Sequence, residues 1–86
     1  MIKVLVADNH PIVRKGIEAV LSNQKDIQIT GNVATTAELF DFIAKKSPDV
    51  VLLEMDIPEV NGITALRKIK KEFSSVKTLM FSAQSE

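Results

Sequence analysis

The chain has 86 residues, enough for one small domain, and its 45% hydrophobic and 26% charged residues are ordinary for a folded globular protein. Its 11 Lys and Arg residues balance its 11 Asp and Glu residues, so bulk charge gives no reason to expect binding to nucleic acid or to an anionic membrane. The lack of cysteine excludes disulfides and thiolate metal sites.

The first apolar run, residues 2–7, ends at Asp8 and predicts a buried strand of a parallel sheet. This run is too short, and with Lys3 too early charged, for a secretory leader. No other apolar run approaches the roughly 20 residues of a membrane span. We therefore expect a cytoplasmic protein without membrane contact.

Helical spacing and strand alternation follow one another along the first half of the chain. Pro11 favours the start of a helix, and an apolar stripe predicts that this helix continues to within residues 22–25. The stripe consists of Val13, Ile17, Val20 and Leu21. Residues 27–33 alternate in part between apolar and polar, which is typical of a half-exposed strand and predicts a sheet edge.

A second helix is predicted by a capping box, in which the Thr35 hydroxyl and the Glu38 carboxylate each accept from a backbone N–H at the helix start. This helix extends to Lys46. Residues 50–53 are a continuous apolar run that Glu54 follows directly, which predicts a second buried strand.

The last helix and strand complete a regular alternation. Apolar residues at helical spacing over 63–73 predict a third helix, and residues 76–81 predict a fourth strand that Ser82 follows. The order β-α-β-α-β-α-β predicts an α/β fold: a doubly wound parallel sheet with right-handed crossovers and helices on both faces.

Polar side chains follow three of the predicted strands: Asp8, Glu54 and Ser82. If those strands are neighbours, the three side chains meet at one edge of the sheet, where open α/β sheets bind ligands. Two carboxylates and a loop carbonyl suit Mg²⁺, and a hydroxyl can donate to a phosphoryl oxygen. The alternative is that acids and serines follow strands only because strands end at the surface, and three together make it the less favoured interpretation.

Three segments carry a resemblance to a known family. They are residues 8–16, with Asp8, Asn9, His10 and Pro11, then residues 48–62, and Ser82 with Ala83. In order and spacing they resemble the receiver domain of two-component response regulators. The first segment is similar to the subclass that carries a LuxR-type helix-turn-helix output domain.

The resemblance implies a flavodoxin-like sheet in strand order 2-1-3-4 and a cytoplasmic signalling module in transcription regulation, not an enzyme. It also implies a phosphoryl group on an acid beside Mg²⁺, with a sensor histidine kinase and the regulator's own output domain as partners. Glu54 occupies the phosphoacceptor position and Ser82 matches the switch hydroxyl. Asp8, Asn9, Glu54 and Asp56, the last through its carbonyl, match the metal-binding residues.

Two departures from the family pattern affect this site. The family acceptor is Asp, and the extra methylene of Glu54 moves the carboxylate outward by roughly 1.5 Å. Such a misplacement can cost on the order of a hundredfold in rate, so we expect phosphorylation to be impaired or mimicked. Asn9 replaces one acid of the usual pair, which weakens Mg²⁺ binding without abolishing it.

A third departure concerns extent. We expect residues 1–86 to form one receiver domain that is incomplete at its carboxyl end, without the fourth helix, fifth strand and fifth helix of the family. The fourth strand would then be an exposed edge, which favours a homodimer through that strand. We expect no direct contact of this segment with nucleic acid.

Two other functions remain open at this point. The chain could be an atypical receiver that acts without phosphate as a protein–protein interaction or dimerisation module. It could also be a small metal-dependent phosphohydrolase, although the sequence supplies no obvious general acid. His10 is interpreted as a positioned loop residue, and the basic side chains of residues 67–71 as a solvated helix face.

Overall fold

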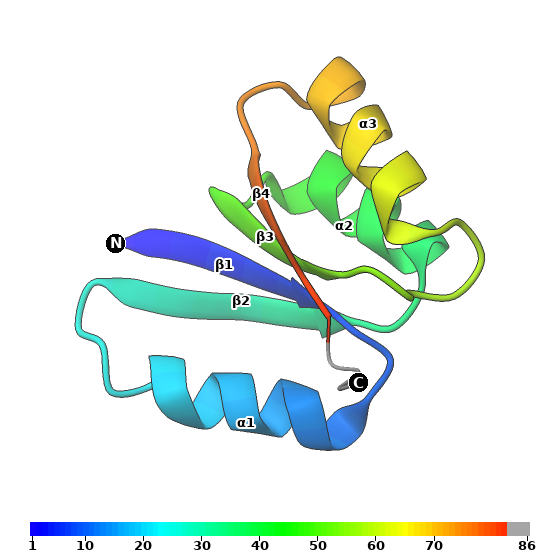
Figure 1. Cartoon of the computed structure of the whole chain (residues 1–86). Coiled ribbons are helices and arrows are strands. Elements are labelled where there is room, and N and C mark those ends of the chain that lie inside the picture. The colour runs from blue at the N-terminus through cyan, green and yellow to red at the C-terminus, as the bar shows by residue number, and fades with distance from the viewer. Residues whose placement is uncertain (83–86) are drawn as a thin grey trace.

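Four parallel strands form the centre of the molecule, and the computed structural model describes residues 1–82 (Figure 1). The strands are β1 (Ile2–Ala7), β2 (Ile27–Val33), β3 (Val50–Glu54) and β4 (Lys77–Phe81). They lie in the order β2-β1-β3-β4, which confirms the predicted topology and the position of β2 at an edge. Among the described residues β4 pairs only with β3, so it forms the other edge.

Three helices connect the strands: α1 (Pro11–Leu21), α2 (Thr36–Lys46) and α3 (Gly62–Glu72). All three agree with the predicted helices to within a few residues. Within the described part of the chain, no helix combines the length and the apolar character needed to cross a membrane.

The two faces of the sheet are covered unequally (Figure 1). α2 and α3 pack on one face and enclose the core, whose buried members include Leu5, Leu39, Ile43, Val51, Leu53, Ala65 and Ile69. α1 lies on the other face and buries none of its own residues. Its predicted apolar stripe instead lines an open groove together with Leu52 of β3, and Val20 stays 67% exposed.

The amino end of α2 carries the predicted capping box with one difference in register. The backbone N–H of Glu38 donates to Thr35 Oγ1 over 3.2 Å, as expected. The Glu38 carboxylate, however, accepts from the N–H of Ala34 over 2.7 Å, one residue before the cap. Two hydrogen bonds, one accepted by Thr35 and one donated by Ala34, therefore stabilise the start of α2.

The loop between β3 and α3 is closed tightly at its ends. The N–H of Gly62 donates to the carbonyl of Met55 over 2.8 Å. A Cβ added at Gly62 would lie 2.8 Å from the Met55 Cα and 2.9 Å from its carbonyl oxygen, so the position requires glycine. Asn61 then caps α3 by accepting from the N–H of Thr64 over 2.9 Å.

We expect Thr35→Ala to lower the free energy of unfolding by about 1 kcal/mol, because it removes the oxygen that satisfies the Glu38 N–H. Thr35→Ser keeps a hydroxyl and should remain close to the native stability. Urea unfolding followed by circular dichroism measures both variants. Equal loss in the two would show that the methyl group, and not the cap, stabilises this helix end.

We expect Gly62→Ala to lower the free energy of unfolding by about 1–3 kcal/mol, because the new methyl group meets backbone atoms that can move only if the loop opens. Gly16→Ala is the matched control, since nothing lies within 4 Å of its added Cβ inside α1. That variant should gain about 0.5–1 kcal/mol. Thermal unfolding of the two variants would contradict this account if Gly62→Ala melted at or above the native temperature.

Candidate functional site

Two carboxylates meet at the carboxyl edge of the sheet. Asp8 follows β1 and Glu54 ends β3, and these strands are neighbours in the sheet. Both side chains are fully buried, at 0% exposure. One ligand atom each from Asp8, Glu54 and His10 lie within 4.8 Å of one another. The predicted convergence of Asp8 and Glu54 is therefore seen in the structure, with His10 as an additional neighbour.

The carboxylate of Asp8 is held on one side only. Its Oδ1 accepts from the backbone N–H of His10 over 2.9 Å and lies 2.7 Å from the His10 Nδ1. Its Oδ2 is buried and has no hydrogen-bond partner among the described residues. Burying a carboxylate oxygen without a partner is costly. A cation at this oxygen would remove that cost.

The carboxylate of Glu54 is turned toward the loop that follows it. Its Oε1 accepts from the backbone N–H of Asp56 over 3.0 Å, and the backbone carbonyl of Glu54 accepts from the N–H of Ile57 over 3.3 Å. These bonds wrap the start of the loop around the end of β3. The acid thus organises the backbone of the residues that come directly after it.

The other predicted site residues lie at the same edge of the sheet. Ser82 directly follows Phe81, the residue of β4 that pairs with Glu54, and it is exposed. Asn9 is exposed in the turn after β1, and the Asp56 side chain is also exposed. The backbone N–H of Asp56 donates to the Glu54 carboxylate.

These residues fit a hard cation such as Mg²⁺, which prefers oxygen ligands and takes few of them from protein. Asp8 supplies a buried oxygen without a partner, and Glu54 supplies a second carboxylate beside it. His10 is 48% exposed and contacts Asp8 through Nδ1, so it positions the Asp8 carboxylate. The sequence contains a signal for the bond from the His10 backbone N–H to Asp8, because an Asp side chain often accepts from the backbone N–H two residues later.

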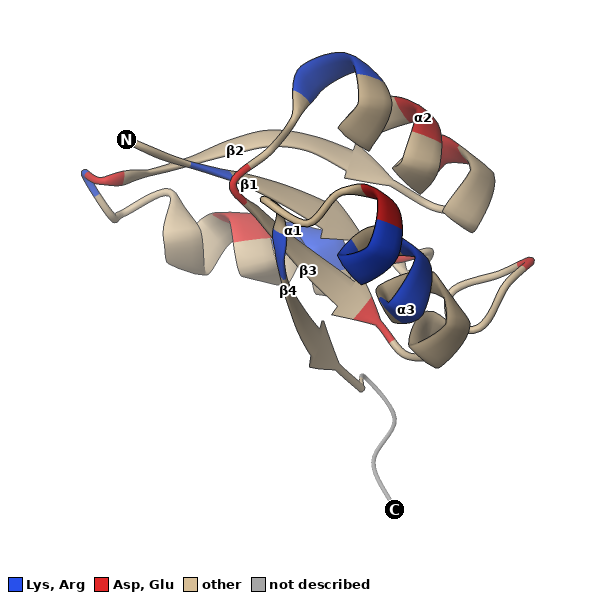
Figure 2. Ribbon diagram, turned by 90° about the horizontal axis from the view of Figure 1, so that it is seen from above, with Lys and Arg blue, Asp and Glu red and all other residues tan. Residues whose placement is uncertain are grey.

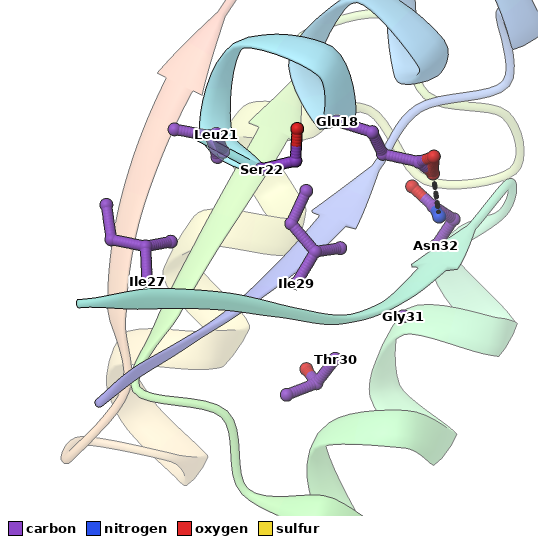
Figure 3. Close-up of a pocket in the computed structure, with 8 residues that line it drawn as sticks. All are labelled: Glu18, Leu21, Ser22, Ile27, Ile29, Thr30, Gly31 and Asn32. Carbon is purple, nitrogen blue, oxygen red and sulfur yellow. Dashed lines mark hydrogen bonds between the residues drawn. The ribbon is translucent and has the colours of Figure 1, made fainter. Parts of the chain in front are cut away.

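Other polar and hollow regions lie apart from this edge. A pocket between α1 and β2 is lined by Glu18, Leu21, Ile27 and Ile29, among others, and Glu18 accepts from Asn32 Nδ2 over 2.5 Å (Figure 3). Basic residues gather on α3 (Figure 2). One of them, Lys68, lies 4.6 Å from the Phe40 ring centroid and 4.0 Å from Glu72. Neither region contains a residue of the predicted site.

Comparison with known proteins gives the family. Residues 4–86 match the model of the response regulator receiver domain. The chain is 34% identical over all of its 86 residues to the response regulator UvrY of Escherichia coli. It is 35% identical over 82 residues to the response regulator protein VraR of Staphylococcus aureus. It spans 39% of the length of each of these relatives.

Solved structures agree with this assignment. RcsB of Salmonella enterica, bound to the promoter rprA in the presence of phosphomimetic BeF3-, superposes with a TM-score of 0.92 at 25% identity over the whole of this chain and 72% of that chain. The receiver domain of the response regulator NarL from Mycobacterium tuberculosis gives 0.89 at 27% identity, over 99% of this chain and 68% of that one. The chain belongs to the response regulator receiver domain family, among relatives of the LuxR type.

Proposed function

We propose that this chain is the receiver module of a two-component response regulator in which Glu54 stands at the phosphoacceptor position and phosphorylation is impaired or mimicked. The observation that carries the proposal is the environment of Glu54. Its carboxylate is fully buried beside Asp8 and accepts from the N–H of Asp56. An acceptor must bring a carboxylate oxygen to the phosphorus atom, and one of the two carboxylate oxygens of Glu54, Oε1, is bonded to the loop.

The proposed chemistry distributes roles among the residues at the sheet edge. Asp8, Asn9, Glu54 and the carbonyl of Asp56 would hold Mg²⁺, which neutralises negative charge on phosphoryl oxygens when it is bound. The unpartnered Asp8 Oδ2 supports this assignment. The Ser82 hydroxyl would donate to a phosphoryl oxygen or to an acidic side chain that takes its place.

The proposed partners are a sensor histidine kinase as phosphoryl donor and the output domain of the same regulator. RcsB, a structural neighbour, was solved bound to the promoter rprA in the presence of phosphomimetic BeF3-. We propose that this segment acts in the cytoplasm as a signalling module, not as an enzyme, and leaves DNA contact to an output domain. The even balance of 11 basic and 11 acidic residues supports that division of roles.

Incubation with acetyl phosphate and Mg²⁺ tests the role of Glu54. We expect Glu54→Asp to gain the mass of one phosphoryl group at a rate about a hundredfold above that of the native chain. The shorter side chain returns the carboxylate to the position of the Asp acceptor of the family. Glu54→Gln should gain none. Intact-mass spectrometry follows the three proteins, and labelling of the native chain as fast as Glu54→Asp would refute impaired phosphorylation.

Among the described residues β4 pairs only with β3, and this edge favours a second function, a phosphate-independent interaction module that pairs with another copy. Lys77 donates to Asp49 of the neighbouring segment and Phe81 accepts from Met55. The alternation of a parallel ladder therefore turns the backbone groups of Thr78 and Met80 toward the open edge. Leu79 on this strand is 61% exposed. Such an edge is a template for strand pairing.

Sedimentation velocity at increasing concentration measures this association. We expect the native chain to dimerise and Leu79→Lys to be monomeric, because charge on an edge strand opposes pairing. Ile12→Lys is the matched control, since Ile12 is 86% exposed and belongs to α1 and not to β4. If Ile12→Lys abolished association and Leu79→Lys did not, α1 and not β4 would be the contact.

A further inference from the structure

A second set of contacts fastens the loop between β3 and α3 to the amino end of α2. The carboxylate of Glu59 accepts through Oε1 from the N–H of Ala37 over 2.9 Å and from the Thr36 hydroxyl over 3.2 Å. Thr36 Oγ1 in turn accepts from the N–H of Val60 over 3.2 Å. Residues 22 to 24 positions apart in sequence are thereby joined.

Thr36 and the loop also meet through the backbone. The carbonyl of Pro58 lies 3.4 Å from both the N–H and the hydroxyl of Thr36. Thr36 is only 2% exposed, so this side chain lies inside the contact and not on the surface. The loop is consequently held at three successive residues, Pro58, Glu59 and Val60.

Glu59 has a backbone conformation that a non-glycine residue rarely adopts. Its φ is 84°, in the left-handed region, where a side chain is strained. Such residues persist when surrounding contacts fix them, and they gather at functional sites. The bonds to Thr36 and Ala37 are the contacts that fix Glu59.

The carboxylate of Glu59 suits its place for an electrostatic reason. The first N–H groups of a helix lack acceptors within the helix and carry partial positive charge. The Thr35 hydroxyl accepts from the N–H of Glu38, and the Glu38 carboxylate accepts from the N–H of Ala34. The Glu59 carboxylate accepts from the N–H of Ala37, and Glu59 lies on the loop between β3 and α3.

The same loop carries the backbone of the candidate site. It begins at Met55, its second residue Asp56 donates its N–H to Glu54, and the bond from the Gly62 N–H to the Met55 carbonyl closes it. With both ends fixed, few residues of the loop can change conformation without moving Pro58 to Val60. Holding those residues at α2 therefore limits how far Asp56 can move from the carboxylates.

We propose that Glu59 is a positioning residue that couples Mg²⁺ binding at the Asp8–Glu54 edge to the order of the amino end of α2. This coupling rests on the proposed function of that edge as a metal site. Metal binding then depends on the Glu59 contact, and by reciprocity metal binding stabilises the Ala37 hydrogen bond. Residues that orient metal ligands typically change metal affinity by 10–100-fold when they are removed.

Calorimetric titration with Mg²⁺ alone measures the first effect. We expect Glu59→Ala to raise the dissociation constant at least tenfold, while Glu59→Gln, which keeps an acceptor oxygen, stays within about threefold of native. Glu38→Ala is the matched control, because it removes a carboxylate from the same helix end that bonds to Ala34 and not to the loop. It should leave Mg²⁺ affinity unchanged. If Glu59→Ala fails to fold, Glu59→Gly serves in its place, since glycine accepts the positive φ.

Hydrogen exchange at the Ala37 N–H measures the reciprocal effect. Mg²⁺ should slow this exchange in the native chain and in Glu38→Ala, and should not change it in Glu59→Ala. Native affinity for Mg²⁺ in Glu59→Ala, in a folded protein, would overturn the positioning role and leave the metal site intact. No Mg²⁺ binding by the native chain would overturn the metal site itself, and the coupling with it.

Discussion

The burial of two carboxylates at neighbouring strand ends is the constraint on which the site depends. Asp8 and Glu54 lie side by side because β1 and β3 are adjacent and parallel, and both are removed from water. Like charges in such a position require compensation from nearby donors. The turn after each strand supplies one, the N–H of His10 for Asp8 and the N–H of Asp56 for Glu54. Each of the two turns is therefore shaped so that a backbone N–H points back to the preceding acid, from His10 to Asp8 and from Asp56 to Glu54.

Sequence pattern predicted the parts of the structure that depend on local periodicity. Apolar runs and stripes located the strands and helices, and the parallel order implied that Asp8 and Glu54 would share an edge. The contact of His10 Nδ1 with Asp8 and the contact of Glu59 with Ala37 were not predicted, because they depend on how far a side chain reaches across a turn or to a residue 22 positions away. The apolar stripe of α1 predicted a helix correctly. Periodicity does not show how much of such a stripe the sheet covers, and no residue of α1 is buried.

Glutamate at position 54 has consequences for the backbone as well as for phosphoryl chemistry. Its Oε1 accepts from the N–H of Asp56 while the residue itself remains in the last position of β3. The loop is thus fastened at its start to the acid and in its middle to α2 through Thr36 and Glu59. A loop with two such attachments is pre-organised, and pre-organised groups bind a ligand without a further cost of ordering.

The unequal covering of the sheet also affects how the molecule opens. α2 and α3 share a continuous core with β1 and β3, whereas α1 buries no residue of its own and is tied to β2 by the Glu18–Asn32 bond. Regions with few buried apolar contacts detach at a smaller free energy than the whole protein. Partial unfolding would therefore release α1 first, in a subglobal step that exposes the apolar side of β1 and β3 while the opposite layer keeps its packing.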